Sequence, residues 1–162
     1  MMKLENEACI EAPIEKVWSV LTDLEAVSEW VEVIKSAHCD SGQRQGVGAS
    51  RVCELSNGLS IKEVWVAWDE GTSFQYEAVG MPLMKRASNR WSLSSENGKT
   101  LVKSEAEIEF KGGVFSKPLE IIMKPLFQSM GRRTFSGLAY LVENGEPYKG
   151  NYRDLPLVPV VC

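Results

Sequence analysis

The sequence predicts an α+β fold: an antiparallel sheet of about seven strands curves around one long C-terminal helix, and two short helices close one end. Three patterns predict this arrangement. A short alternating segment (4–11) opens the chain, strand and turn signals fill 33–110, and helical spacing occupies 118–143. The length of 162 residues suits one domain with a sizeable core.

The first segments read as a strand followed by two short helices. Segment 4–11 places apolar residues mainly at even positions and charged residues at odd ones, as in a half-buried strand. Pro13 suits the first turn of a helix, where its missing N–H costs no hydrogen bond. That helix has a buried stripe at i, i+3, i+4 and i+7 spacing, namely Ile14, Val17, Trp18 and Leu21. Asp23 suits the N-cap of a second short helix that carries Leu24, Val27 and Trp30.

Turn residues divide 33–110 into six strands. The turn signals are Gly46–Gly48, Asn57–Gly58, Gly71–Thr72, Gly80–Pro82 and Asn97–Gly98. Because the connections are short, we expect an antiparallel meander. The closing helix then presents one face at helical spacing: Leu119, Met123, Leu126, Met130, Thr134, Gly137 and Leu141.

The Asn57–Gly58 turn predicts a hairpin register. A two-residue loop would place Val52 opposite Glu63 and Glu54 opposite Ile61. One face of the hairpin would carry Val52, Glu54, Ile61, Glu63 and Trp65, and the other Arg51, Cys53, Leu55, Lys62, Val64, Val66 and Trp68. Both faces are mixed and the second is more apolar, so the pattern alone leaves the buried face open.

The last residues form a separate segment. We divide the chain into a domain at 1–144 and a tail at 145–162, because three prolines exclude a helix from the tail. Segment 155–161 is too apolar for a free end. It is expected to pack along the domain or against a second copy of the chain, which would make a homodimer.

The charge balance argues against several classes of function. The net charge is −4 and the pI about 5.2, whereas a nucleic-acid-binding surface is basic. No apolar run approaches the roughly 20 residues that span a bilayer. The first residues lack the apolar core of a signal peptide. We therefore expect a cytoplasmic protein with no nucleic-acid partner and no membrane-spanning segment.

Metal and histidine chemistry also have little support. His38 is the only histidine, and the sequence has no HExxH or GxSxG motif and no phosphate-binding glycine loop. We expect no metal and no cofactor. Four cysteines lack CxxC spacing and are expected to be thiols in a reducing compartment; they are Cys9, Cys39, Cys53 and Cys162.

Several of these residues resemble a known family. The quoted positions are Ala12–Pro13, Val17–Trp18, Leu21, Asp23 and Trp30, then Gly46–Gly48 and the strand Glu63–Asp69. They resemble the START-like (SRPBCC), or helix-grip, superfamily, and within it the polyketide cyclase/dehydrase and lipid-transport branch. The resemblance covers about 4–143. It departs at Glu32, where many members have proline, and in the tail.

The resemblance implies a deep, mostly apolar cavity that holds a lipid, a polyketide or a similar hydrophobic molecule. It also favours the hairpin face that turns Glu63 inward. The residues that we expect to line the cavity are Trp30, Glu63, Trp65, Tyr76, Asn89, Trp91, Met123, Phe127 and Met130.

Three functions follow from these expectations. The preferred one is non-catalytic binding, by a carrier, sensor or accessory protein. The second is a polyketide cyclase or dehydratase with Glu63 as general acid or base: Glu54 and Glu63 together would push one pKa upward, and Tyr76 or Asn89 would steady an enolate. The third is an interaction module that self-associates through its tail.

Overall fold

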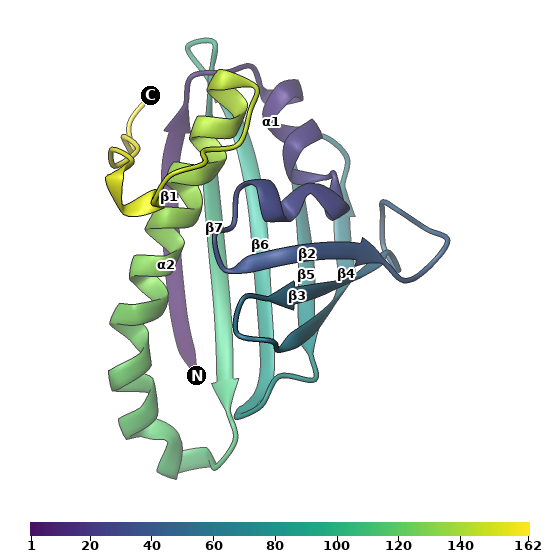
Figure 1. Ribbon diagram of the computed structural model, residues 1–162, viewed down its shortest axis with the longest axis vertical. Helices are drawn as coiled ribbons and strands as arrows, with labels where there is room; N and C mark the ends of the chain where they lie inside the picture. The colour runs from purple at the N-terminus through teal and green to yellow at the C-terminus, as the bar shows by residue number, and fades with distance from the viewer.

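The computed structural model covers residues 1–162 and confirms the predicted fold (Figure 1). Seven strands form one antiparallel sheet in the order β1-β7-β6-β5-β4-β3-β2. They are β1 (Met2–Ile10), β2 (Ile34–Cys39), β3 (Ser50–Leu55), β4 (Ser60–Asp69), β5 (Ser73–Val79), β6 (Met84–Glu96) and β7 (Lys99–Phe110). The helices are α1 (Ile14–Leu21) and α2 (Lys117–Asn144), with short 3₁₀ turns η1 (Leu24–Glu29), η2 (Gly113–Ser116) and η3 (Tyr152–Asp154). None of the helices has the length and apolarity needed to cross a bilayer.

The sheet curls strongly along its width. In Figure 1, β1 and β7 run along the molecule, whereas β2 and β3 cross it in front of the other strands. The helix α1 and the turn η1 close one end, where the predicted stripe of α1 is buried at Val17, Trp18 and Leu21. Asp23 occupies the N-cap of η1, although its side chain makes no capping hydrogen bond.

The hairpin between β3 and β4 corrects the predicted register by one residue. Arg51 pairs with Glu63 and Glu54 with Ser60. The loop has three residues instead of two, because Gly58 takes a left-handed conformation (φ 87°) and Leu55 N–H donates to the carbonyl of Leu59 at 2.8 Å. Arg51 and Glu63 therefore share one face, and Glu54 lies on the other.

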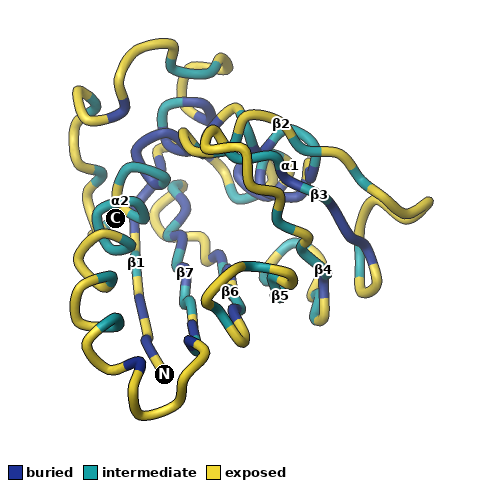
Figure 2. Tube along the Cα trace, turned by 60° about the horizontal axis from the view of Figure 1, so that its bottom comes forward, coloured by how far each residue is buried: buried dark blue, intermediate teal, exposed yellow.

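The two halves of α2 differ in burial (Figure 2). The buried residues of the helix lie at 135–139, Leu141 and Val142, in its C-terminal half. The N-terminal half is mostly exposed, and Leu126, which was placed on the inner stripe, is 55% exposed. Phe127 faces inward instead. Consecutive residues lie about 100° apart around a helix, so these two neighbours point in different directions.

The tail packs on its own domain. Tyr152 is buried, and its hydroxyl donates to the carbonyl of Glu29 at 3.1 Å. Near the end of the chain, the backbone N–H of Cys9 in β1 donates to the carbonyl of Pro159 at 2.6 Å. The tail therefore packs along the domain, while Leu157 and Val161 stay exposed.

A disulfide joins the two ends of the chain and corrects the expectation of four thiols. Cys9 and Cys162 are bonded across a separation of 153 residues, whereas Cys39 and Cys53 are free. Spacing along the sequence gave no sign of this bridge, since its partners meet only after β1 and the tail come together. Disulfides persist mainly in oxidising compartments, so the cysteines no longer favour a reducing one.

Candidate functional site

An internal cavity of about 230 Å³ lies between the sheet and α2. Its 18 lining residues, of which 11 are hydrophobic, come from every strand of the sheet, from the η1–β2 segment and from α2. The cavity lies beside the middle of α2, which contributes Phe127, Gly131, Thr134 and Phe135 to its wall. A concave and mostly apolar space with a few polar groups is typical of a small-molecule site.

Aromatic rings form one wall of the cavity. Trp30 meets Trp91 edge-on, with ring centroids 5.6 Å apart, and Trp91 stacks on Phe135 of α2 at 5.2 Å. Phe127 adds a further ring from the N-terminal half of the helix. Such rings present large, flat apolar surfaces to a ligand.

A buried ion pair forms the polar end of the cavity. Arg51 Nε donates to Glu63 Oε2 at 2.6 Å, and Arg51 Nη1 donates to the carbonyl of Leu24 at 3.0 Å. The guanidinium also lies 4.9 Å from the ring centre of Trp65. Burial alone would lower the pKa of Arg51, but the Glu63 carboxylate, together with Tyr76 and Cys53, outweighs burial and the pKa is raised. Arg51 is therefore held as a cation in the cavity wall.

A chain of hydrogen bonds crosses three strands beside this pair. Ser104 Oγ donates to Asn89 Oδ1 at 2.8 Å, and Asn89 Nδ2 donates to the Tyr76 hydroxyl at 3.4 Å. Burial, and then the nearby Glu63 carboxylate, raise the pKa of Tyr76 to about 12. The phenol is therefore protonated at neutral pH and can donate a hydrogen bond.

The expected site residues fall into two groups. Those that line the cavity are Trp30, Glu63, Tyr76, Asn89, Trp91 and Phe127. The other three do not line it. Trp65 lies behind Arg51 and contacts Tyr76 at 4.9 Å between ring centroids, Met123 packs against a small core around Ile108 and Phe110, and Met130 borders a separate small pocket.

The structure contradicts the predicted pair of carboxylates. Glu54 lies on the opposite face of the hairpin from Glu63 and accepts a hydrogen bond from the Ser60 hydroxyl at 2.7 Å. The partner of Glu63 is the cation Arg51. Glu54 and Glu63 therefore do not form the predicted pair of carboxylates in the cavity.

Sequence reasoning missed three polar residues of the cavity wall, Asn6, Arg51 and Ser104. Asn6 and Ser104 share the inward parity of Leu4 and Ile108 on β1 and β7, and a polar residue at an inward position is itself a signal. The predicted hairpin register placed Arg51 on the face opposite Glu63. That register was wrong by one residue, and such an error moves every side chain of a strand to the other face.

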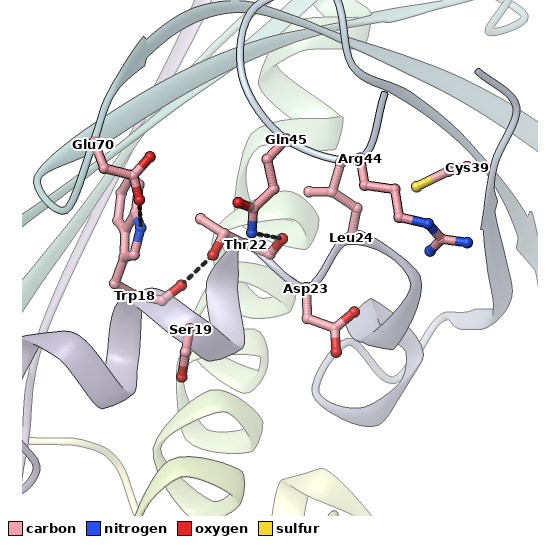
Figure 3. Close-up of a pocket in the computed structure, with 9 residues that line it drawn as sticks. All are labelled: Trp18, Ser19, Thr22, Asp23, Leu24, Cys39, Arg44, Gln45 and Glu70. Carbon is pink, nitrogen blue, oxygen red and sulfur yellow. Dashed lines mark hydrogen bonds between the residues drawn. The ribbon is translucent and has the colours of Figure 1, made fainter. Parts of the chain in front are cut away.

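A larger groove of about 620 Å³ lies on the surface between α1 and the β2–β3 loop (Figure 3). Some of its polar groups already have partners: the carboxylate of Glu70 accepts from the indoles of Trp18 at 3.0 Å and Trp68 at 2.7 Å, and Arg44 pairs with Glu25. Only three of its nine lining residues are hydrophobic, against 11 of 18 in the internal cavity. The internal cavity is therefore the better candidate site for a hydrophobic ligand despite its smaller volume.

Comparisons with known proteins agree with the architecture. The family model described as "Polyketide cyclase / dehydrase and lipid transport" matches residues 1–143. No curated protein matches the chain at a significant level.

Solved structures share the fold at low sequence identity. A solution structure from Thermobifida fusca is 16% identical, with a TM-score of 0.74, and the match covers 93% of this chain and 99% of that one. A crystal structure from Thermus thermophilus is 20% identical, with a TM-score of 0.72 and coverage of 88% and 98%. The crystal structure of Ara h 8.0201 is also 20% identical, with a TM-score of 0.68 and coverage of 88% and 97%. Since its family model spans nearly the whole domain, this chain belongs to the polyketide cyclase/dehydrase and lipid transport family.

Proposed function

We propose that this protein binds a small hydrophobic molecule in the internal cavity and acts as a carrier, a sensor or an accessory protein. One observation carries the proposal: the cavity has an aromatic wall at one side and a small set of fixed polar groups at the other. Apolar walls supply affinity, and a few polar groups orient the ligand. The family description, which includes lipid transport, agrees with this role.

Native mass spectrometry of the purified protein, followed by organic extraction, tests the proposal. We expect a bound hydrophobic molecule in stoichiometric amount. The variant Ala106→Trp fills the cavity from β7 and should lose the ligand, and Ala106→Leu serves if the larger side chain prevents folding. The control Ser94→Trp adds the same side chain at an exposed position of β6 and should keep the ligand. Equal ligand content in Ala106→Trp and Ser94→Trp would contradict the proposal.

An enzymatic role for Glu63 is the second candidate function. It is favoured by the position of the carboxylate, which lines the cavity and whose Oε1 makes no hydrogen bond within the protein. Such a group can accept a proton from a bound substrate. Glu63→Gln should then abolish turnover of a polyketide-like substrate, while Glu54→Gln on the outer face should not. Turnover that survives Glu63→Gln would remove Glu63 from the catalytic role.

A further inference from the structure

The polar end of the internal cavity is electrically balanced. Arg51 and Glu63 are the only residues of its wall that carry a charge at neutral pH, and they bond to each other at 2.6 Å. Their side chains are 4% and 12% exposed, so bulk water screens the pair little. A carboxylate ligand would meet Glu63, and an ammonium ligand would meet Arg51, with no free counter-charge for either. A charged group taken from water into such a space loses its hydration and gains no counter-charge, so the cavity selects against it.

Hydrogen-bonding capacity is left over at this end. Arg51 uses Nε and Nη1, which leaves Nη2 free to donate, and Glu63 uses Oε2, which leaves Oε1 free to accept. The Tyr76 hydroxyl accepts from Asn89 and donates to no protein group. These three residues therefore offer two donors and one acceptor to whatever enters.

A further donor lies on the aromatic wall. Trp30 is 4% exposed, and its indole Nε1 is buried without a hydrogen-bond partner. Buried donors in native proteins are nearly always paired. Trp30 lines the cavity, and a ligand oxygen that reached Nε1 would satisfy this donor.

A hydroxyl group fits this set of groups better than other oxygen functions. It donates one hydrogen bond and accepts two, so it can donate to Glu63 Oε1 while it accepts from Tyr76 or Arg51. A carbonyl only accepts and would leave the Glu63 oxygen unpaired beside it. The volume of about 230 Å³, equal to roughly eight water molecules at about 30 Å³ each, limits the ligand to a small molecule.

We propose that the cavity selects an uncharged aromatic alcohol or phenol, whose hydroxyl sits between Glu63, Arg51 and Tyr76 and whose rings lie against Trp91 and Phe135. The proposal rests on the proposed function, since it names the class of ligand for the same cavity. It excludes fatty acids and other ionised amphiphiles as preferred ligands.

Isothermal titration calorimetry at pH 7 with three naphthyl compounds tests the selection. They share one ring system and differ in the polar group: 2-naphthol is neutral, 2-naphthoate is an anion and 2-naphthylmethylammonium is a cation. We expect wild-type protein to bind 2-naphthol at least about tenfold more tightly than either ion, a difference of about 1.4 kcal/mol. Equal or tighter binding of 2-naphthoate would overturn the proposal.

The variant Glu63→Gln changes the charge and keeps the shape of the side chain. It leaves Arg51 without a counter-charge, so the preference should move by about tenfold or more toward 2-naphthoate. The control Glu54→Gln makes the same chemical change on the opposite face of the hairpin and should leave the preference unchanged. A thermal melt of each variant confirms that it is folded. An unchanged preference in folded Glu63→Gln would overturn the proposal.

A second variant isolates the hydroxyl contact. Tyr76→Phe should weaken 2-naphthol and leave naphthalene, which has no hydroxyl, at its wild-type affinity. An equal loss for both compounds would show a packing effect and count against the proposal. If wild-type protein binds none of the naphthyl compounds, or binds them without selection, this inference is overturned. The proposed function fails only if native mass spectrometry also finds the same ligand content in Ala106→Trp and Ser94→Trp.

Discussion

The two halves of α2 belong to one helix and have opposite environments. The C-terminal half, from Phe135 to Val142, is buried in the main core of 21 residues and is covered by the tail. The N-terminal half, from Lys117 to Met130, packs against a small core of five buried residues and exposes Ile121 and Ile122. The C-terminal half of the helix therefore contributes most to the stability of the fold. The other end packs on the smaller core and contributes Phe127 to the cavity wall.

The largest expected effect separates the two halves directly. Leu138→Ala, at a position with no exposure, should lower the free energy of unfolding by about 2–5 kcal/mol, because it leaves a cavity in the main core. Leu126→Ala makes the same change at a position that is 55% exposed and should cost less than about 1 kcal/mol. Urea unfolding followed by far-UV circular dichroism measures both. Equal losses would show that the halves contribute equally to stability.

The disulfide tests how firmly the tail is held over the C-terminal half. Cys162→Ser removes a cross-link between residues 153 apart and should cost about 2–5 kcal/mol, since the unfolded chain regains the freedom that the bridge removes. The control Cys39→Ser removes a free, partly buried thiol and should have a smaller effect. The measurement is urea unfolding with and without a reductant. Reductant should destabilise wild-type protein but not Cys162→Ser. If Cys162→Ser unfolds at the same urea concentration as wild-type protein, the bridge adds no stability.

Two glycines of α2 sharpen the comparison. A Cβ on Gly137 would lie 2.5 Å from the ring of Tyr152 and 2.6 Å from the backbone oxygen of Trp30. Because a backbone atom cannot easily move away, Gly137→Ala should destabilise the protein by about 1–3 kcal/mol.

The matched change in the looser region is Gly131→Ala. There a Cβ would lie 2.5 Å from Asn6 Nδ2, the end of a side chain that can turn aside. The gain in helix propensity of up to about 1 kcal/mol then offsets the contact, so the net change should be close to zero. Thermal melts of both variants give the two values. If Gly131→Ala and Gly137→Ala destabilise the protein equally, the two regions of α2 do not differ in how tightly they are packed.

The sequence predicted the fold well where a pattern is local. Pro13 and the spacing of Val17 and Trp18 predicted α1, and glycines at 71, 80 and 98 predicted the turns. A left-handed glycine is required at these turns whatever the rest of the chain does, so the signal is strong.

The sequence could not predict features that depend on distant contacts or on a single residue of register. Asn57–Gly58 fits a two-residue or a three-residue loop, and only the longer loop turns Arg51 toward Glu63. The Cys9–Cys162 bridge depends on where the tail lies, which no spacing reveals. Leu126 and Phe127 are adjacent apolar residues, and the packing of the whole helix decides which one faces inward.

The smallest expected effect concerns the exposed face of the N-terminal half. Ile121 is 75% exposed, and isoleucine and serine have similar helix propensities, so Ile121→Ser removes little burial and should change the free energy of unfolding by less than about 0.5 kcal/mol. Urea unfolding measures the stability, and native mass spectrometry measures the mass. A loss above about 1.5 kcal/mol, or a change from a dimeric to a monomeric mass, would mean that a second copy covers this face. The homodimer expected through the tail would then form through α2, and its N-terminal half would be an interface instead of an exposed surface.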